Sequence, residues 1–242
     1  MIRAFILALS DLSDRRILVI LFQALAITAI IFLVLGALLL WLLAGADPCS
    51  WVSDGFCPLG GVAGGAGAVA ITLVGAWLLF PGLAIGVITG FADRIAATVE
   101  LRHYPDAAAT ARPVGFAKGI GLGLRSASRL LLFNLLATPF YLLLLVTGVG
   151  PFVLFVIVNG LAFGRDLGEL AAARHGDRNS RRAWRNSTRG EQNLMGTMVS
   201  VMFLIPFVNL IAPVVGTAMA IHLFNRSKQI AVRSSRPARQ GD

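Results

Sequence analysis

Charged residues are scarce in this chain. Only 14% of its 242 residues are charged and 57% are hydrophobic, whereas a soluble domain carries about 25% charged residues. Charge is missing from four stretches, 17–46, 59–92, 130–164 and 194–221. Each is longer than the roughly 20 residues that span a hydrocarbon core of about 30 Å. This scarcity excludes a soluble globular protein and predicts an all-α integral membrane protein.

The sequence also lacks the patterns of an enzyme, a metal protein or a nucleic-acid binder. It has no nucleophile motif such as G-x-S-x-G. Its three histidines (103, 175 and 222) are scattered, and no Cys/His spacing fits zinc. The net charge of +9 comes from basic residues that flank apolar stretches instead of alternating with aromatic residues. We expect no catalysis, cofactor, metal or nucleic acid, and the lipid bilayer as a partner.

The first apolar stretch is interpreted as a retained membrane helix. "LLAGA" at 42–46 faintly resembles a signal-peptide cleavage site. However, the apolar core before it is far longer than the 7–15 residues of a signal peptide. The first membrane segment is therefore expected to remain in the mature protein.

Basic residues are absent from one hydrophilic loop, and this absence sets the predicted topology. All 21 Lys and Arg residues lie in four blocks, 1–16, 93–129, 165–193 and 226–242, and loop 45–58 has none. The positive-inside rule places the blocks and both termini in the cytoplasm and the loop outside. Two full transmembrane helices follow, at about 17–44 and 59–92, with a kink at Pro81 in the second.

The third and fourth apolar stretches must leave the cytoplasm and return to it. Turn-forming residues interrupt them, at Gly148-Val-Gly-Pro151 and at "IPFVNLIAP" (205–213). The return arms, 152–164 and 214–224, have 13 and 11 residues, or about 20 and 16 Å at 1.5 Å per residue. We predict two partly inserted helical hairpins, at about 127–164 and 192–226. One tilted helix through residues 148–151 is the alternative.

The remaining segments complete a single membrane domain over residues 1–226. Apolar residues at helical spacing in 2–12 predict an amphipathic helix at the membrane surface. Residues 91–104 and 165–189 are expected to form cytoplasmic helical extensions, the second ending in the polar turn "HGDRNSRR". The basic tail, 227–242, is expected to be disordered.

Three stretches resemble the CysZ-type sulfate permeases, which are grouped with the etoposide-induced membrane proteins of eukaryotes. They read "FPGLAIGVITGFADRIAATVE" (80–100), "GPFVLFVIVNGLAFGRDLGELAAARHG" (150–176) and "LIPFVNLIAPVVGTAMAIHLF" (204–224). The likeness covers most of residues 1–226. It implies two full spans, two partly inserted hairpins and a homo-oligomer. In bacteria it also implies sulfate uptake across the cytoplasmic membrane for cysteine synthesis.

The family's sulfate site resembles a Gly-Leu-Arg-Arg motif at the cytoplasmic start of the first span. The equivalent stretch here is "LSDRRILVI" (12–20), in which Arg15 and Arg16 match and Ser13 and Asp14 replace Gly-Leu. Guanidinium groups and free N–H groups at a helix N-terminus bind a dianion. Asp14 would repel the dianion or pair with the arginines. Arg15 and Arg16 are the candidate anion-binding residues, with membrane anchoring as the alternative.

Several other residues are candidates for polar contacts. Arg165 and Glu169, four residues apart, suit an ion pair at the cytoplasmic interface. Arg174 and His175 either line a cytoplasmic mouth or lie on a solvated face, which is favoured. Amides within apolar runs either join helices or line a pore: Gln23, Asn134, Asn159 and Asn209. Cys49 and Cys57 form a candidate disulfide in the outer loop, and "GGVAGGAG" (60–67) has small-residue spacing for close helix packing.

We therefore predict a permease or channel for a small oxyanion, sulfate above all. The alternative is a non-transporting protein of the same family that organises the membrane or serves as a scaffold.

Overall fold

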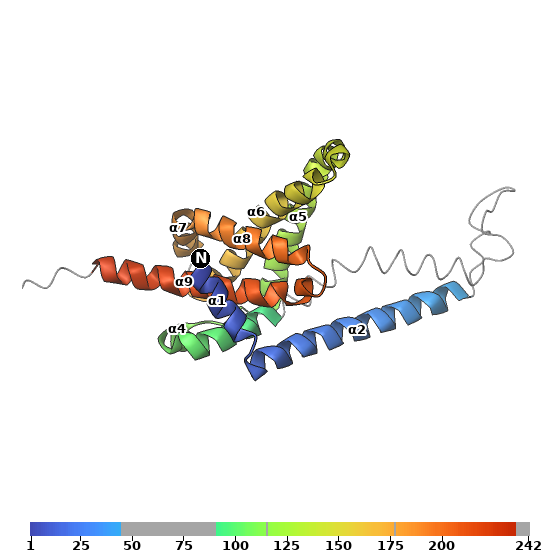
Figure 1. Ribbon diagram of the computed structural model, residues 1–242. Coiled ribbons are helices and arrows are strands. Elements are labelled where there is room, and N and C mark those ends of the chain that lie inside the picture. Colours follow the sequence, from blue (N-terminus) through green and yellow to red (C-terminus); the bar gives the residue numbers. More distant parts are fainter. Residues whose placement is uncertain (45–90, 115, 177, 236–242) are drawn as a thin grey trace, which may run out of the picture. The chain divides into compact units, whose positions relative to one another are not determined.

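The computed structural model describes residues 1–44, 91–114, 116–176 and 178–235 (Figure 1), and these contain helices and no strands. The elements are α1 (Ile2–Asp11), α2 (Arg15–Ala44), α4 (Pro105–Thr110), α5 (Phe116–Leu144), η2 (Leu145–Thr147), α6 (Gly150–Ala173), α7 (Arg178–Ser187), α8 (Arg189–Phe203) and α9 (Val208–Ser235). Residues 91–103 are also helical. The predicted all-α class is confirmed.

The chain divides into two compact units, Met1–Leu21 with Ile88–Asp242, and Phe22–Val87. Within the second unit, only the part of α2 from residue 22 to 44 is described. Most of the predicted second span, Pro81, the two cysteines and "GGVAGGAG" lie outside the described residues. The site described below belongs entirely to the first unit.

Four of the described helices are long and apolar enough to cross a membrane. The qualifying segments are Arg15–Leu38, Gly121–Thr147, Gly150–Ala173 and Val208–Ile230, with mean hydropathies between 1.4 and 2.9. Such segments meet the length requirement of a bilayer crossing. The chain is a multi-pass membrane protein.

The break predicted in the third apolar stretch is confirmed. After η2 the chain turns at Gly148, whose φ of +70° favours glycine. The hydroxyl of Thr147 accepts the N–H of Gly150 at 2.8 Å, and Pro151 occupies the first turn of α6, where its missing N–H costs nothing. α5 and α6 then pack as a hairpin (Figure 1). The alternative of one continuous helix is wrong.

The second hairpin is present, but its turn lies earlier than expected. α8 ends at Phe203 and α9 begins at Val208, after Phe207 at a φ of +65°. Pro213, predicted to be part of the turn, lies inside the second turn of α9. Proline has no N–H to donate to the carbonyl four residues earlier, so that about one helical hydrogen bond is lost at this position.

Both return helices are longer than the predicted arms. α6 has 24 residues and α9 has 28, because each continues beyond its apolar part into the following charged segment. Residues 227–235 are therefore helical, in contrast to the expected disordered tail. α7 begins at Arg178, so that most of the predicted turn "HGDRNSRR" is helical as well.

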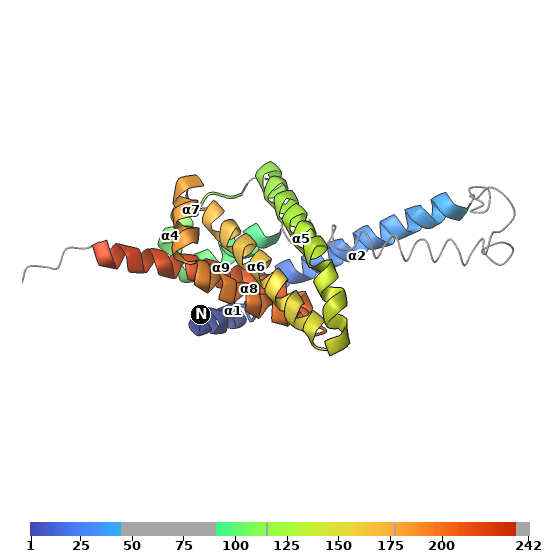
Figure 2. The ribbon, with the colours of Figure 1, turned by 90° about the horizontal axis from the view of Figure 1, so that it is seen from above.

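The core of the first unit lies where α1, α6, α8 and α9 meet (Figure 2). Its largest fully buried apolar side chains come from α8, α9, the start of α2 and helix 91–103: Ile17, Val99, Met195, Val199, Val215, Met219 and Ile221. α1 buries its small residues, Ala4 and Ala8, and exposes Ile2 and Ile6. The predicted amphipathic helix is present, and its exposed apolar face suits a membrane surface.

α6 and α8 approach until their backbones touch. A Cβ on Gly196 of α8 would lie 1.9 Å from the backbone oxygen of Gly160 and 2.4 Å from the nitrogen of Gly164. A Cβ on Gly164 would lie 2.1 Å from the backbone oxygen of Gln192. This is the small-residue packing of membrane helices.

Candidate functional site

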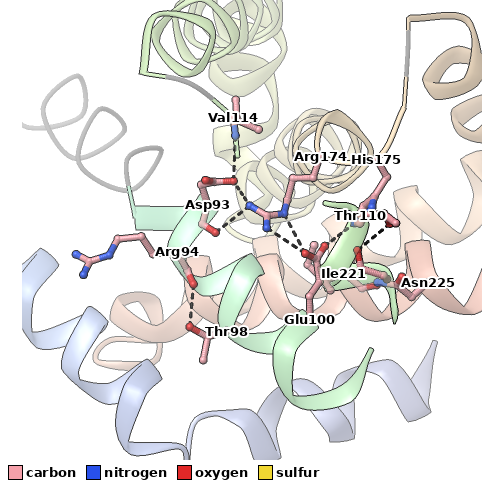
Figure 3. Close-up of polar contacts among 11 residues, drawn as sticks. Asp93, Arg94, Thr98, Glu100, Thr110, Val114, Arg174, His175, Ile221 and Asn225 are labelled. Atoms are coloured by element: carbon pink, nitrogen blue, oxygen red, sulfur yellow. Dashed lines mark hydrogen bonds and ion pairs between the residues drawn. The ribbon is translucent and has the colours of Figure 1, made fainter. Parts of the chain in front are cut away.

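A buried arginine joins segments that are far apart in sequence. Arg174, directly after α6, donates from Nη2 and Nε to Glu100 Oε2 at 3.0 and 3.2 Å. From Nη1 it donates to the backbone oxygen of Asp93 at 3.2 Å and to the Asp93 carboxylate (Figure 3). His175 Nε2 lies 2.7 Å from Glu100 Oε1. We call Asp93, Glu100, Arg174 and His175 the Arg174 network.

The network keeps a charged carboxylate inside the protein. The Glu100 side chain is 0% exposed and that of Arg174 is 4% exposed. Burial alone would raise the pKa of Glu100, but hydrogen bonds from His175 and Arg174 outweigh it and hold the pKa below its ordinary value of 4.5. A buried ion is stable only when it is paired and hydrogen-bonded in this way. The network therefore fastens helix 91–103 to the end of α6.

The favoured placement of Arg174 and His175 on a solvated face is wrong. Both side chains are buried, and the ring of His175 stacks on that of Phe224 with the ring centroids 5.1 Å apart. One sequence pattern could have indicated this burial. Asp93 and Glu100 are seven residues apart and therefore share a face of helix 91–103.

A second buried carboxylate lies between two histidines. Asp11, the last residue of α1, has Oδ1 2.7 Å from His103 Nε2 and Oδ2 2.9 Å from His222 Nε2. The hydroxyl of Tyr104 lies 2.9 Å from His222 Nδ1. Arg102 Nη1 lies 3.4 Å from Asp11 Oδ1. We call Asp11, His103, Tyr104 and His222 the Asp11 cluster; it joins α1, the end of helix 91–103 and α9.

The environment favours an ionised Asp11 and a protonated Tyr104. Burial alone would raise the pKa of Asp11, but hydrogen bonds from His222 and His103 outweigh it and lower the pKa below its ordinary value of 3.8. Burial raises the pKa of Tyr104, so that the phenol keeps its proton at neutral pH. Asp11 and His222 are buried, whereas the His103 side chain is 24% exposed.

The expectation that the three histidines lie apart is wrong for two of them. One ligand atom from each of Asp11, His103 and His222 can be chosen so that all lie within 4.8 Å of one another. These three residues could hold a metal ion. Sequence spacing missed this group because its members are separated by about 90 and 120 residues, and only the packing of α1 and α9 brings them together.

The candidate anion-binding arginines lie at the beginning of α2. Arg15 and Arg16 are exposed, while Ile17 is fully buried in the core. Asp14 Oδ1 accepts the backbone N–H of Arg16 at 2.8 Å, as an N-cap residue does. Asp14 Oδ2 lies 3.6 Å from Arg102 Nη1. The guanidinium that pairs with Asp14 thus comes from helix 91–103.

The interfacial residues of α6 pair with other helices. The expected pair of Arg165 with Glu169 is replaced by Glu169 and Arg185 of α7, whose Oε2 and Nη1 lie 3.8 Å apart. Asp166 pairs with Arg129 and Ser126 of α5. Among the described residues, the buried Nε of Arg165 has no hydrogen-bond partner. Two carboxylates of α6 therefore pair with neighbouring helices: Asp166 with α5 and Glu169 with α7.

The candidate amides differ in their surroundings. Asn134 and Asn159 each donate to a backbone oxygen of their own helix, that of Leu130 and Phe155, both at 2.9 Å. One side-chain N–H of each amide is therefore bonded within its own helix, and the roles in interhelical contact or pore lining stay predictions. Asn209 is exposed near the start of α9, and Gln23 lies in α2 within the second unit.

Comparison with known proteins identifies the family. No curated protein and no solved structure matches the chain. A family model described as "Sulfate transporter CysZ/Etoposide-induced protein 2.4" matches residues 4–213. Since this match covers most of the chain, including the Arg174 network, the first hairpin and α8, the protein belongs to the CysZ/etoposide-induced protein 2.4 family.

Proposed function

We propose that this protein is a non-enzymatic permease or channel for a small oxyanion, with sulfate as the first candidate. Its proposed place is the bacterial cytoplasmic membrane, where sulfate uptake would supply cysteine biosynthesis. The observation that carries the proposal is the family match over residues 4–213, because the family's description names a sulfate transporter.

The start of α2 supports Arg15 and Arg16 as the anion-binding residues. Both guanidinium groups are exposed beside a helix N-terminus, a location that favours anions. Asp14 is the obvious competitor for them. Its carboxylate contacts the N–H of Arg16 and the guanidinium of Arg102, so that the two arginine side chains remain available for a dianion.

The hairpins suit partial insertion from the cytoplasmic side. α6 has 15 residues before its first charge, Arg165, which is about 22 Å at 1.5 Å per residue. α8, with 15 residues in all, also spans about 22 Å. The uncharged part of α6 and the whole of α8 are shorter than a hydrocarbon core of about 30 Å, although α5, α9 and the full length of α6 could cross it. We propose that the shorter apolar arm limits how deeply each hairpin inserts. Two full spans cannot enclose a pore alone, so we propose conduction through a homo-oligomer with both termini cytoplasmic.

Removing both arginines tests the site. Cells that carry Arg15→Ala with Arg16→Ala should take up labelled sulfate no faster than a strain lacking the protein. The reason is that the dianion loses both guanidinium groups that would hold it. Uptake of radiolabelled sulfate, normalised to the amount of protein in the membrane, is the measurement. Uptake at the wild-type rate would disprove the site.

Two matched variants separate anion binding from general effects. Arg178→Ala removes an exposed arginine of α7 and should leave uptake unchanged. Asp14→Asn removes a negative charge while its side-chain oxygen still caps Arg16, and uptake should be equal or faster. A scaffold protein would show no sulfate uptake in any of these strains.

A further inference from the structure

We propose that Asp11, His103 and His222 form a binding site for a divalent transition-metal ion of the zinc type. This inference is independent of the proposed transport function. The three side chains offer one carboxylate and two imidazoles, which are the usual oxygen and nitrogen ligands of zinc. Three protein ligands leave a fourth position for water or another donor.

The ligand atoms are already gathered in one place. His103 Nε2 and His222 Nε2 face the two oxygens of Asp11 at 2.7 and 2.9 Å, and the two rings lie edge to face with centroids 5.0 Å apart. Ligand bonds of about 2.0 Å in a tetrahedron place the donor atoms roughly 3.3 Å apart. The three ligand atoms lie within 4.8 Å of one another, so that side-chain rotations would bring them to this spacing around an ion.

The residues around the cluster also suit a metal ligand. The Nδ1 of His222 lies 2.9 Å from the Tyr104 hydroxyl. Metal-binding histidines almost always donate their second N–H to an oxygen acceptor such as a carboxylate, a backbone carbonyl or water, which directs the other nitrogen at the ion. The Tyr104 hydroxyl is placed to be this acceptor. His222 and Asp11 are buried, and the partly exposed ring of His103 provides access from solvent.

The positively charged side chain of Arg102 can move away from Asp11 when an ion binds. The guanidinium of Arg102 lies beside Asp11, with Nη1 3.4 Å from Oδ1, and its side chain is 43% exposed. The same nitrogen lies 3.6 Å from Asp14 Oδ2. Arg102 therefore keeps a carboxylate partner when an ion occupies Asp11. The bound ion would join α1, helix 91–103 and α9.

The test is a cobalt and zinc titration of the purified full-length chain. Tag-free protein in detergent is stripped with a chelator and titrated with Co²⁺, which absorbs visible light strongly when four-coordinate. We expect one Co²⁺ per chain, displacement by Zn²⁺, and a rise in the thermal midpoint with metal because the ion binds only the folded state. Absence of four-coordinate cobalt would overturn the proposal.

Substitutions test which residues bind the ion. His103→Ala should lower the affinity for Co²⁺ at least 100-fold. We choose His103 over His222 because the His103 ring is partly exposed, so that its removal disturbs folding less. Tyr104→Phe should lower the affinity about tenfold, as expected for a residue that orients a ligand. Asp106→Asn removes an exposed carboxylate of α4 outside the cluster and should have no effect. Equal affinities for His103→Ala and Asp106→Asn would contradict the site.

Discussion

Replacing Gly196 with alanine is expected to separate α6 from α8 and to destabilise the protein by about 3 kcal/mol, the upper end for overpacking. The added Cβ would lie 1.9 Å from the backbone oxygen of Gly160 and 2.4 Å from the nitrogen of Gly164. Backbone atoms cannot rotate away as a side chain can, so the two helices must move apart. Thermal unfolding in detergent and the yield of monodisperse protein measure the effect.

A matched control lies in the same helix. Gly190 of α8 has no atom within 4 Å of an added Cβ. Gly190→Ala should therefore leave the protein as stable as the wild type or slightly more stable, because alanine favours helix over glycine by up to about 1 kcal/mol. If Gly196→Ala and Gly190→Ala unfold at the same temperature, the close packing of α6 on α8 is wrong.

Arg174→Met should destabilise the protein at least as much, for an electrostatic reason. Methionine fills a similar volume but leaves the fully buried Glu100 without its guanidinium partner. Removing one member of a buried ion pair costs about 3–5 kcal/mol. The second variant, Arg174→Met with Glu100→Gln, removes the unpaired charge and should recover much of the loss. The midpoint of thermal unfolding compares the three proteins.

The destabilisation caused by Arg174→Met should also depend on pH. The pKa of Glu100 in the folded protein lies below its ordinary value of 4.5, since hydrogen bonds from His175 and Arg174 outweigh burial. The ionised group therefore stabilises the fold above about pH 4.5, and this contribution is lost as the pH falls through the lower folded pKa. The difference in thermal midpoint between the wild type and Arg174→Met should be largest near neutral pH and should become smaller in acid. A difference that is constant with pH would contradict the role of Glu100.

The sequence predicted the parts of this fold that depend on local composition. The absence of charge located the apolar segments, and Gly148 with Pro151 located the first hairpin turn, because glycine and proline act through their own backbone. The end of α9 was predicted less well. A basic, polar sequence resembles a disordered tail, but residues 227–235 continue a helix that tertiary packing has already formed.

The buried polar groups were the hardest to predict. Arg174, Asp11 and His222 carry charge or polarity, and local sequence favours solvent for such residues. Their partners come from helices separated by about 70 to 210 residues. The Gly160, Gly164 and Gly168 spacing, by contrast, is visible in the sequence and indicates a close helix contact. Residues that pair across the fold can be recognised only after the helices have been placed.

Sulfate flux into liposomes tests the proposed transport function most directly. Purified full-length protein is reconstituted, and the entry of radiolabelled sulfate is followed with empty liposomes and the Arg15→Ala, Arg16→Ala protein as controls. The account predicts saturable influx through the wild-type protein and influx at the level of empty liposomes for the variant. Wild-type influx no greater than that of empty liposomes would contradict it and would favour a scaffold protein of the same family.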